Sequence, residues 1–194
     1  MLAVSVTVHV TLEDVYEGRN VLYSTTVNVL RADQLLEIRE RRGAVPLSRW
    51  PLERLVDPNR APITVFGEGH EMHHHDRVIF GNLFLNINVL PHPLYRMDMM
   101  GWSGFAHDLH ASLVVTLVDY FEGRVFALPH PSGRRGAEPI MVEYQGGDKV
   151  KTFPGQGMRG RGTLYVHFDL DLPSSRQERE ALRNIIVAVR ARVG

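Results

Sequence analysis

The chain has 194 residues, of which 44% are hydrophobic, and its 22 Lys and Arg residues are balanced by 22 Asp and Glu residues. This composition is ordinary for a folded protein, and the zero formal charge gives no long-range field that would gather the chain onto nucleic acid or an anionic membrane. The absence of Cys excludes disulfides and thiolate metal sites, and no segment resembles a secretory signal or a membrane helix of about 20 residues, so we expect a cytoplasmic protein.

The first predicted element is a β-strand over residues 4–10, where valines at even positions alternate with polar residues at odd positions. The same alternation marks strands at 83–89 and 164–170. A period of two residues indicates sheets with one buried face, so we expect an all-β fold made of sandwiches or barrels.

Short helical turns are predicted directly after the first strand, at residues 12–17, and again at residues 117–122. Each turn is followed by a glycine, Gly18 or Gly123. Glycine suits the left-handed conformation that commonly closes a helix, so we expect it at both positions.

An internal duplication links these elements. The sequence TLEDVYEGR at 11–19 shares six of nine positions with TLVDYFEGR at 116–124, and GNLFLNINV from Gly81 shares a spaced pattern with GTLYVHFDL from Gly162. Two matches in the same order predict two copies of one architecture. The predicted organisation is a first β-sandwich domain at 1–92, a linker at 93–106, a second β-sandwich domain at 107–173 and a C-terminal helix at 174–194.

The linker is rich in Pro, Met and Gly, but it carries Tyr95 and Trp102, so we expect it to be packed. In the C-terminal helix, Ser174 and Ser175 are N-cap candidates because Gln177 and Glu178 follow at capping-box spacing. Aliphatic residues then recur at helical spacing and predict a narrow dimerisation stripe, formed by Leu182, Ile185, Ile186 and Val189.

Five motifs occur in an order that resembles the C-terminal substrate-binding region of DnaJ-type co-chaperones, over residues 3 to about 190. They are TLEDVYEG at 11–18, ITVFGEG at 63–69, LPHPLYRMD at 90–98, FPGQGM at 153–158 and RGTLYV at 161–166. The resemblance implies two tandem β-sandwich domains, a peptide-binding groove on the first domain, and a terminal helix that forms a homodimer.

By this resemblance the groove is lined by side chains of three strands. Alternate residues of one strand point to the same face, so the positions on each strand are compatible with one surface. An apolar strip beside an exposed strand edge would accept an extended polypeptide by β-augmentation. The implied peptide-binding residues are Val6, Val8, Val21, Tyr23, Thr25 and Leu85.

The sequence also departs from the family pattern. It has no His-Pro-Asp tripeptide of a J domain and no Cys-based zinc module, so the class B members are the more similar type. In class B members basic residues beside the groove engage the acidic tail of the seventy-kilodalton heat-shock chaperone. Val21 stands at the matching position, which weakens the expectation that this partner docks here.

Residues 43–62 are longer than the turn that the family has at this place. Apolar side chains in this segment predict an extra helical turn, which either packs on the first domain or offers a contact surface. They are Trp50, Leu52, Leu55 and Val56.

Other chemistry has weak support. The histidine-rich segment GEGHEMHHHD offers His70, His73, His74 and His75 as possible metal ligands, but it matches a variable hairpin loop, so we expect no catalytic residue, metal or cofactor and no enzyme activity. His92 and His130, each between two prolines, are interpreted as turn residues. Basic spots at predicted turns are interpreted as solvated loops, at Arg134, Arg135, Arg159 and Arg161.

Two functional hypotheses follow. The leading one is that the chain binds extended apolar segments of unfolded polypeptide clients, as the client-binding part of a DnaJ-like co-chaperone. The alternative is an architectural subunit, in which the same fold connects parts of a large protein assembly. The missing J domain and the missing basic residue favour the alternative, because both features serve cycling with a partner ATPase.

Overall fold

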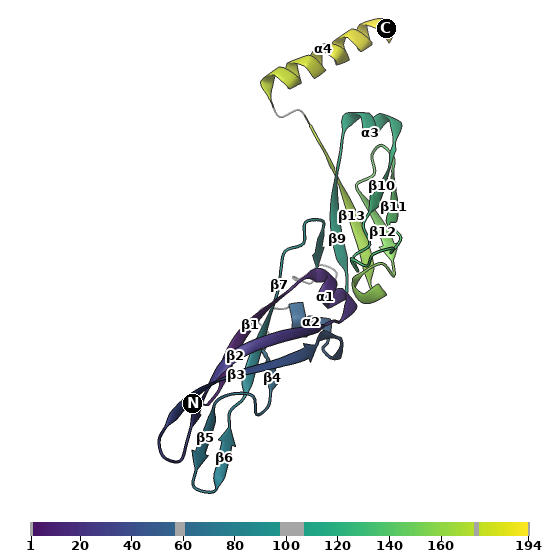
Figure 1. The fold of residues 1–194 in the computed structure, drawn as a ribbon. Coiled ribbons are helices and arrows are strands. Elements are labelled where there is room, and N and C mark those ends of the chain that lie inside the picture. The colour runs from purple at the N-terminus through teal and green to yellow at the C-terminus, as the bar shows by residue number, and fades with distance from the viewer. Residues whose placement is uncertain (1, 57–60, 98–106, 173–174, 194) are drawn as a thin grey trace.

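The computed structural model describes residues 2–56, 61–97, 107–172 and 175–193, in which β-strands are the main secondary structure and one long helix lies at the C-terminal end (Figure 1). The all-β class with a C-terminal helix is therefore confirmed. The strands form four sheets, two in each half of the chain.

The first half holds a three-stranded and a four-stranded sheet. The smaller one has the order β1-β7-β4, formed by β1 (Val4–Val10), β7 (Leu83–Val89) and β4 (Ile63–Val65). The larger one has the order β3-β2-β5-β6, formed by β3 (Leu36–Pro46), β2 (Asn20–Leu30), β5 (Glu71–His74) and β6 (Arg77–Phe80).

The second half holds a four-stranded and a two-stranded sheet. The first has the order β12-β13-β9-β8, formed by β12 (Val150–Pro154), β13 (Thr163–Leu170), β9 (Leu109–Val115) and β8 (Tyr95–Met97). The second is the hairpin of β10 (Arg124–Leu128) and β11 (Ile140–Tyr144).

The strand pairing of the first half recurs in the second. Strand β1 is parallel to β7, which is antiparallel to β4. In the same way β9 is parallel to β13, which is antiparallel to β12. The β2–β3 hairpin has its counterpart in β10–β11. The duplicated motifs thus fold into duplicated pairings, while the domain boundaries stay predictions.

Two short helices follow the first strand of each half, with the predicted bounds: α1 (Leu12–Glu17) and α3 (Leu117–Glu122). Each begins with a capping box, in which a threonine and an aspartate exchange hydrogen bonds, Thr11 with Asp14 and Thr116 with Asp119. Gly18 closes α1 in the left-handed conformation, at φ 64° and ψ 35°. Gly123 differs from the prediction: its φ is 75° but its ψ is 162°, so the chain leaves α3 directly into β10.

The predicted linker begins with a strand. Tyr95, in β8, pairs with Ala111 of β9 and is only 2% exposed, which confirms that this part of the segment is packed. Its hydroxyl donates a hydrogen bond of 2.5 Å to the carbonyl of Pro129. Trp102, the second aromatic residue of the linker, lies outside the described residues.

The segment 43–62 starts as the end of β3 and continues into a 3₁₀ turn, η1 (Leu47–Arg49), and a helix, α2 (Leu52–Val56). Leu52 and Leu55 are 1% and 2% exposed and belong to the core, and α2 contacts β7. The predicted helical turn therefore packs on the first half, although the side chain of Val56 lies outside the described residues.

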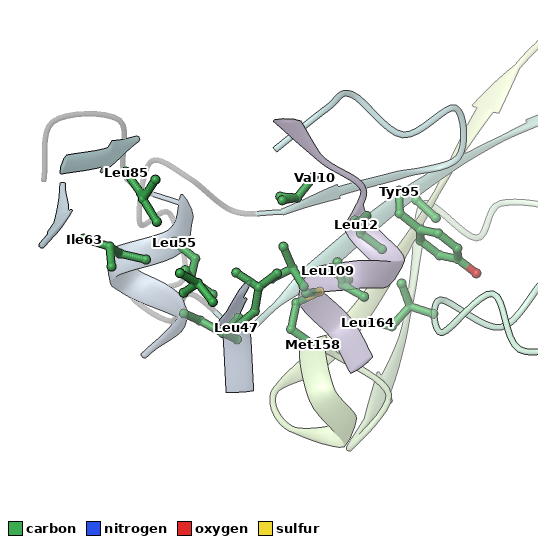
Figure 2. Close-up of a cluster of buried hydrophobic side chains, with 14 of the residues drawn as sticks. Val10, Leu12, Leu47, Leu55, Ile63, Leu85, Tyr95, Leu109, Met158 and Leu164 are labelled. Carbon is green, nitrogen blue, oxygen red and sulfur yellow. The ribbon is translucent and has the colours of Figure 1, made fainter. Parts of the chain in front are cut away.

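The core is continuous across both halves. Figure 2 shows Leu47 and Leu12 from the first half facing Met158 and Leu109 from the second, all of them almost fully buried. Met158 belongs to a second 3₁₀ turn, η2 (Met158–Gly160), between β12 and β13. The burial of these side chains from both halves removes apolar surface from water and holds the halves together.

The last element is the helix α4 (Arg176–Val193), which extends away from the sheets (Figure 1). Ser175 is confirmed as its N-cap, because its Oγ accepts a hydrogen bond from the Glu178 backbone while Glu178 accepts one from the Ser175 backbone. Ser174 and the side chains of Ile185, Ile186 and Val189 lie outside the described residues. In the described part of the chain no helix is both long and apolar enough to cross a membrane.

Candidate functional site

Along most of its length, one edge of β2 pairs with no strand of the described residues. Strand β2 pairs with β3 from Asn20 to Leu30, but on its other side it pairs with β5 only at Val29 and Leu30. The neighbouring β1 is the edge strand of the smaller sheet and contacts β2. The two sheets of the first half therefore present an open strand edge at β2 with β1 beside it.

The end of this edge is marked by His70, whose Nδ1 accepts a hydrogen bond of 2.9 Å from the backbone of Asn28. In a β-strand the backbone N–H and C=O groups of successive residues point to opposite sides of the strand. The bond to Asn28 therefore identifies the residues whose backbone groups face the open edge. The backbone groups of Leu22, Ser24 and Thr26 therefore point to the same side as that of Asn28. Sequence reasoning missed the role of His70, since its partner lies 42 residues away.

The six predicted groove residues divide into two groups. Val6, Val8 and Val21 are half-buried apolar residues packed against the core, and Thr25 is also half-buried. Val6 and Val8 lie on β1, and Val21 and Thr25 lie on the neighbouring β2. Their role in peptide binding stays a prediction.

Tyr23 and Leu85 are core residues instead. They are 8% and 1% exposed, because Leu85 lies on the central strand β7 and both side chains point into the space between the sheets. The resemblance to the family had placed both residues in the groove, and the role of these buried side chains in peptide binding stays a prediction.

Tyr23 is held in its site by the residue opposite it. A Cβ atom on Gly43, its partner in β3, would lie 2.4 Å from the Tyr23 hydroxyl, so only glycine leaves room for the ring. Burial, and then the nearby carboxylate of Glu68, raise the pKa of Tyr23 above its ordinary value.

A shallow apolar cavity lies on the same stretch of β2. Its volume is about 680 Å³, and the side chain of Leu22 on its wall is 78% exposed. The charged residues Glu40 and Arg42 form its border and pair with each other. Sequence reasoning did not single out Leu22, although its position on β2, next to Val21 and Tyr23, was available as a signal.

The histidine-rich segment does not gather its ligands around one point. His70 bonds to β2, the Nε2 atom of His73 lies 2.5 Å from Glu71, and the rings of His74 and His75 contact each other edge to face. Among the residues that the structure describes, no group of three or more His, Asp or Glu side chains is placed to hold a metal ion.

The remaining histidines of interest stabilise turns, as predicted. The Nδ1 atom of His92 accepts hydrogen bonds from the backbones of Leu94 and Tyr95, and that of His130 accepts one from the backbone of Ser132. These bonds satisfy backbone groups next to prolines. The ring of His130 also lies 2.9 Å from Ser132 Oγ, and that of His92 lies 3.3 Å from Glu13.

A family model described as the DnaJ C terminal domain matches residues 4–173, which is most of the chain. A search of curated proteins found no match.

Proposed function

Because this chain belongs to the DnaJ C-terminal domain family, a chaperone-type and non-catalytic family, we propose that it binds extended apolar segments of unfolded polypeptides along the open edge of β2. The observation that carries the proposal is the unpaired side of β2 between Asn20 and Asn28. A client strand placed there would continue the sheet β3-β2 by one strand.

The chemistry of such binding has two parts. Backbone groups of Leu22, Ser24 and Thr26 would form the hydrogen bonds, which give affinity without reading sequence. Apolar contacts would come from Val6 and Val8 of β1 on one side of the client and from Leu22 on the other. Hydrophobic association at these positions accounts for a preference for apolar clients.

The sharpest test removes a single backbone donor. Thr26→Pro deletes the N–H that faces the open edge, and proline is tolerated at such positions of edge strands because the bonds to β3 are kept. We expect about a tenfold weaker affinity for a labelled apolar peptide, together with weaker suppression of aggregation of an unfolded model client.

Thr26→Ala is the matched control, because it removes the same side chain and keeps the N–H. It should bind the peptide as the unchanged protein does, and both variants should retain the circular dichroism spectrum of the folded chain. Equal affinity of the folded Thr26→Pro variant would reject the β2 edge as the binding site.

Side-chain substitutions test the apolar part. Val6→Asp combined with Val8→Asp places charges beside the edge, where both residues are half-buried, and should abolish aggregation suppression. Leu85→Asp is unsuitable for this test, because a carboxylate at a 1% exposed position would unfold the sheet.

The architectural role is the second candidate, and the position of α4 favours it. This helix extends away from both sandwiches, as a connecting element would (Figure 1). One stoichiometric partner on purification would support a connector, whereas heterogeneous clients would support chaperone function. Under either function we propose a homodimer through α4, and docking of the seventy-kilodalton heat-shock chaperone is disfavoured by the apolar Val21.

A further inference from the structure

The two halves of the chain enclose a cleft of about 900 Å³ on the side of α1. One wall is the end of α1 with Tyr16, Glu17 and Gly18, and the other consists of two loops of the second half, at 130–137 and 159–161. Neither loop belongs to the β2 edge. The cleft is therefore a site separate from the one proposed for apolar clients.

The charges of the cleft are strongly unbalanced. Four arginines line it against one carboxylate, although the whole chain has no net charge. Arg134 and Arg135 come from one loop, and Arg159 and Arg161 from the other, so the fold brings together two basic spots that are about 25 residues apart in the sequence. These arginines were predicted to lie in solvated loops, and the structure adds that the two loops line one cleft.

Two of the four arginines have structural partners. Arg134 forms an ion pair with Glu17 across the cleft. Arg159 donates hydrogen bonds to three backbone carbonyls of the first half. Arg135 and Arg161 form no ion pair or side-chain hydrogen bond with the residues that the structure describes, so their guanidinium groups are available to a ligand.

The positive charges also affect one another. Burial, and then the nearby charge of Arg161, lower the pKa of Arg159. Repulsion between these two guanidinium groups is a cost that a bound anion would relieve. The cleft therefore carries excess positive charge. Among the described residues that line it, Glu17 alone has a carboxylate to offset that charge.

The chemistry of the lining selects the class of anion. Guanidinium groups bind carboxylates through charge-assisted hydrogen bonds, and one such pair already lies in the cleft, where Nε and Nη2 of Arg134 both donate to one carboxylate oxygen of Glu17. A volume of about 900 Å³ exceeds the needs of a single small ion and fits a ligand of drug size or a short peptide segment. A nucleic acid polymer fits poorly, because the neutral chain offers no extended basic surface.

We propose that the cleft between the halves binds a short acidic peptide segment, whose carboxylates pair with Arg135 and Arg161. Arg134 adds to the attraction while it stays paired with Glu17, and Arg159 keeps the loop of η2 in place. This binding is independent of the β2 edge, so a polypeptide with an acidic and an apolar segment could engage both sites.

The test measures binding of a fluorescein-labelled tetra-glutamate peptide to the full chain by fluorescence anisotropy. Arg135→Gln combined with Arg161→Gln should weaken its affinity at least about tenfold, since each substitution removes a charge-assisted pair. Both residues are exposed, so the variant should fold normally. A tetra-glutamine peptide should bind none of the proteins.

Arg77→Gln combined with Arg96→Gln is the matched control. It changes the net charge by the same amount at exposed positions outside the cleft, and it should alter the affinity less than about twofold. Equal weakening by both double variants, or no binding of tetra-glutamate by the unchanged chain, would overturn the proposal. Inorganic tripolyphosphate that binds in place of the acidic peptide would overturn the peptide assignment as well.

Discussion

Arg159 joins the two halves through its side chain. Its Nε, Nη1 and Nη2 atoms donate to the carbonyls of Val15, Trp50 and Leu47, at 3.0, 3.2 and 2.9 Å. The rigid fork of the guanidinium group is what allows one residue to reach three carbonyls. The residue also holds a φ of 56°, an unfavourable value for a side chain with a Cβ, which the three bonds offset.

We predict that Arg159→Ala lowers the free energy of unfolding by about 3 kcal/mol, because three carbonyls lose a charged donor. Urea denaturation measures the change. Arg161→Ala is the control, since this exposed neighbour has no such bonds, and it should change the stability by less than about 0.5 kcal/mol. Similar losses for both variants would show that the three bonds contribute little.

Tyr95 makes the stability depend on pH in the alkaline range. Burial, and then the nearby Tyr16, raise the pKa of the Tyr95 hydroxyl from 10.0 to about 12. The unfolded chain therefore loses this proton at a lower pH than the folded chain does. The stabilising contribution is fully present below pH 10 and is lost as the pH rises through 12.

We predict a loss of about 2–3 kcal/mol in the free energy of unfolding between pH 10 and pH 12 from this residue, since one pKa unit corresponds to about 1.4 kcal/mol. Urea denaturation at several pH values measures the slope. Tyr95→Phe should have a shallower slope over this range, and an unchanged slope in that variant would assign the pH dependence to other groups.

At the scale of elements, the sequence predicted what local patterns determine. The strands of β1, β7 and β13 followed from alternation, and α1 and α3 followed from their position before a glycine. Strand β8 and the open edge of β2 could not be predicted, because both depend on which distant strand pairs with which. Alternation also could not distinguish a groove from a core, so it did not reveal that Leu85 is only 1% exposed.

Gly18 shows why α1 must end where it does. Its φ is 64°, and a Cβ atom there would lie 2.8 Å from the Cβ of Ser48 in η1, closer than real Cβ contacts. Gly136 has a similar φ of 83° but no atom within 4 Å of such a Cβ. A substitution at Gly136 therefore adds backbone strain alone, whereas one at Gly18 adds strain and steric overlap.

We predict that Gly136→Ala costs about 1 kcal/mol of stability through strain alone, and that Gly18→Ala costs about 2–4 kcal/mol because η1 must also move. Chemical denaturation of the two variants gives the difference. Equal costs would mean that the segment at Ser48 shifts freely and that α1 is not fixed against it.

At the scale of the whole molecule, the duplication accounts for the repeated strand pairing. Both halves use the same pairing of a parallel central pair with an antiparallel edge strand, and the halves share one core. Packing side by side brings the loops at 130–137 and 159–161 of the second half onto α1 of the first. The basic cleft is therefore a product of the tandem arrangement, which explains why no local motif could reveal it.

The helix α4 extends away from both sandwiches (Figure 1). In the sequence, residues 182, 185, 186 and 189 recur at helical spacing, which predicts an apolar stripe on α4. We predict that Leu182→Asp combined with Ile186→Asp converts a dimer into a monomer in sedimentation equilibrium, because two charges would enter the centre of the helix pair. Gln177→Asp combined with Asn184→Asp is the matched control, as it adds two negative charges on the opposite face and should leave the dimer intact. Truncation after Ser174 should also give a monomer, and a dimer that survives both the substitution and the truncation would place the interface on the sandwiches instead of α4.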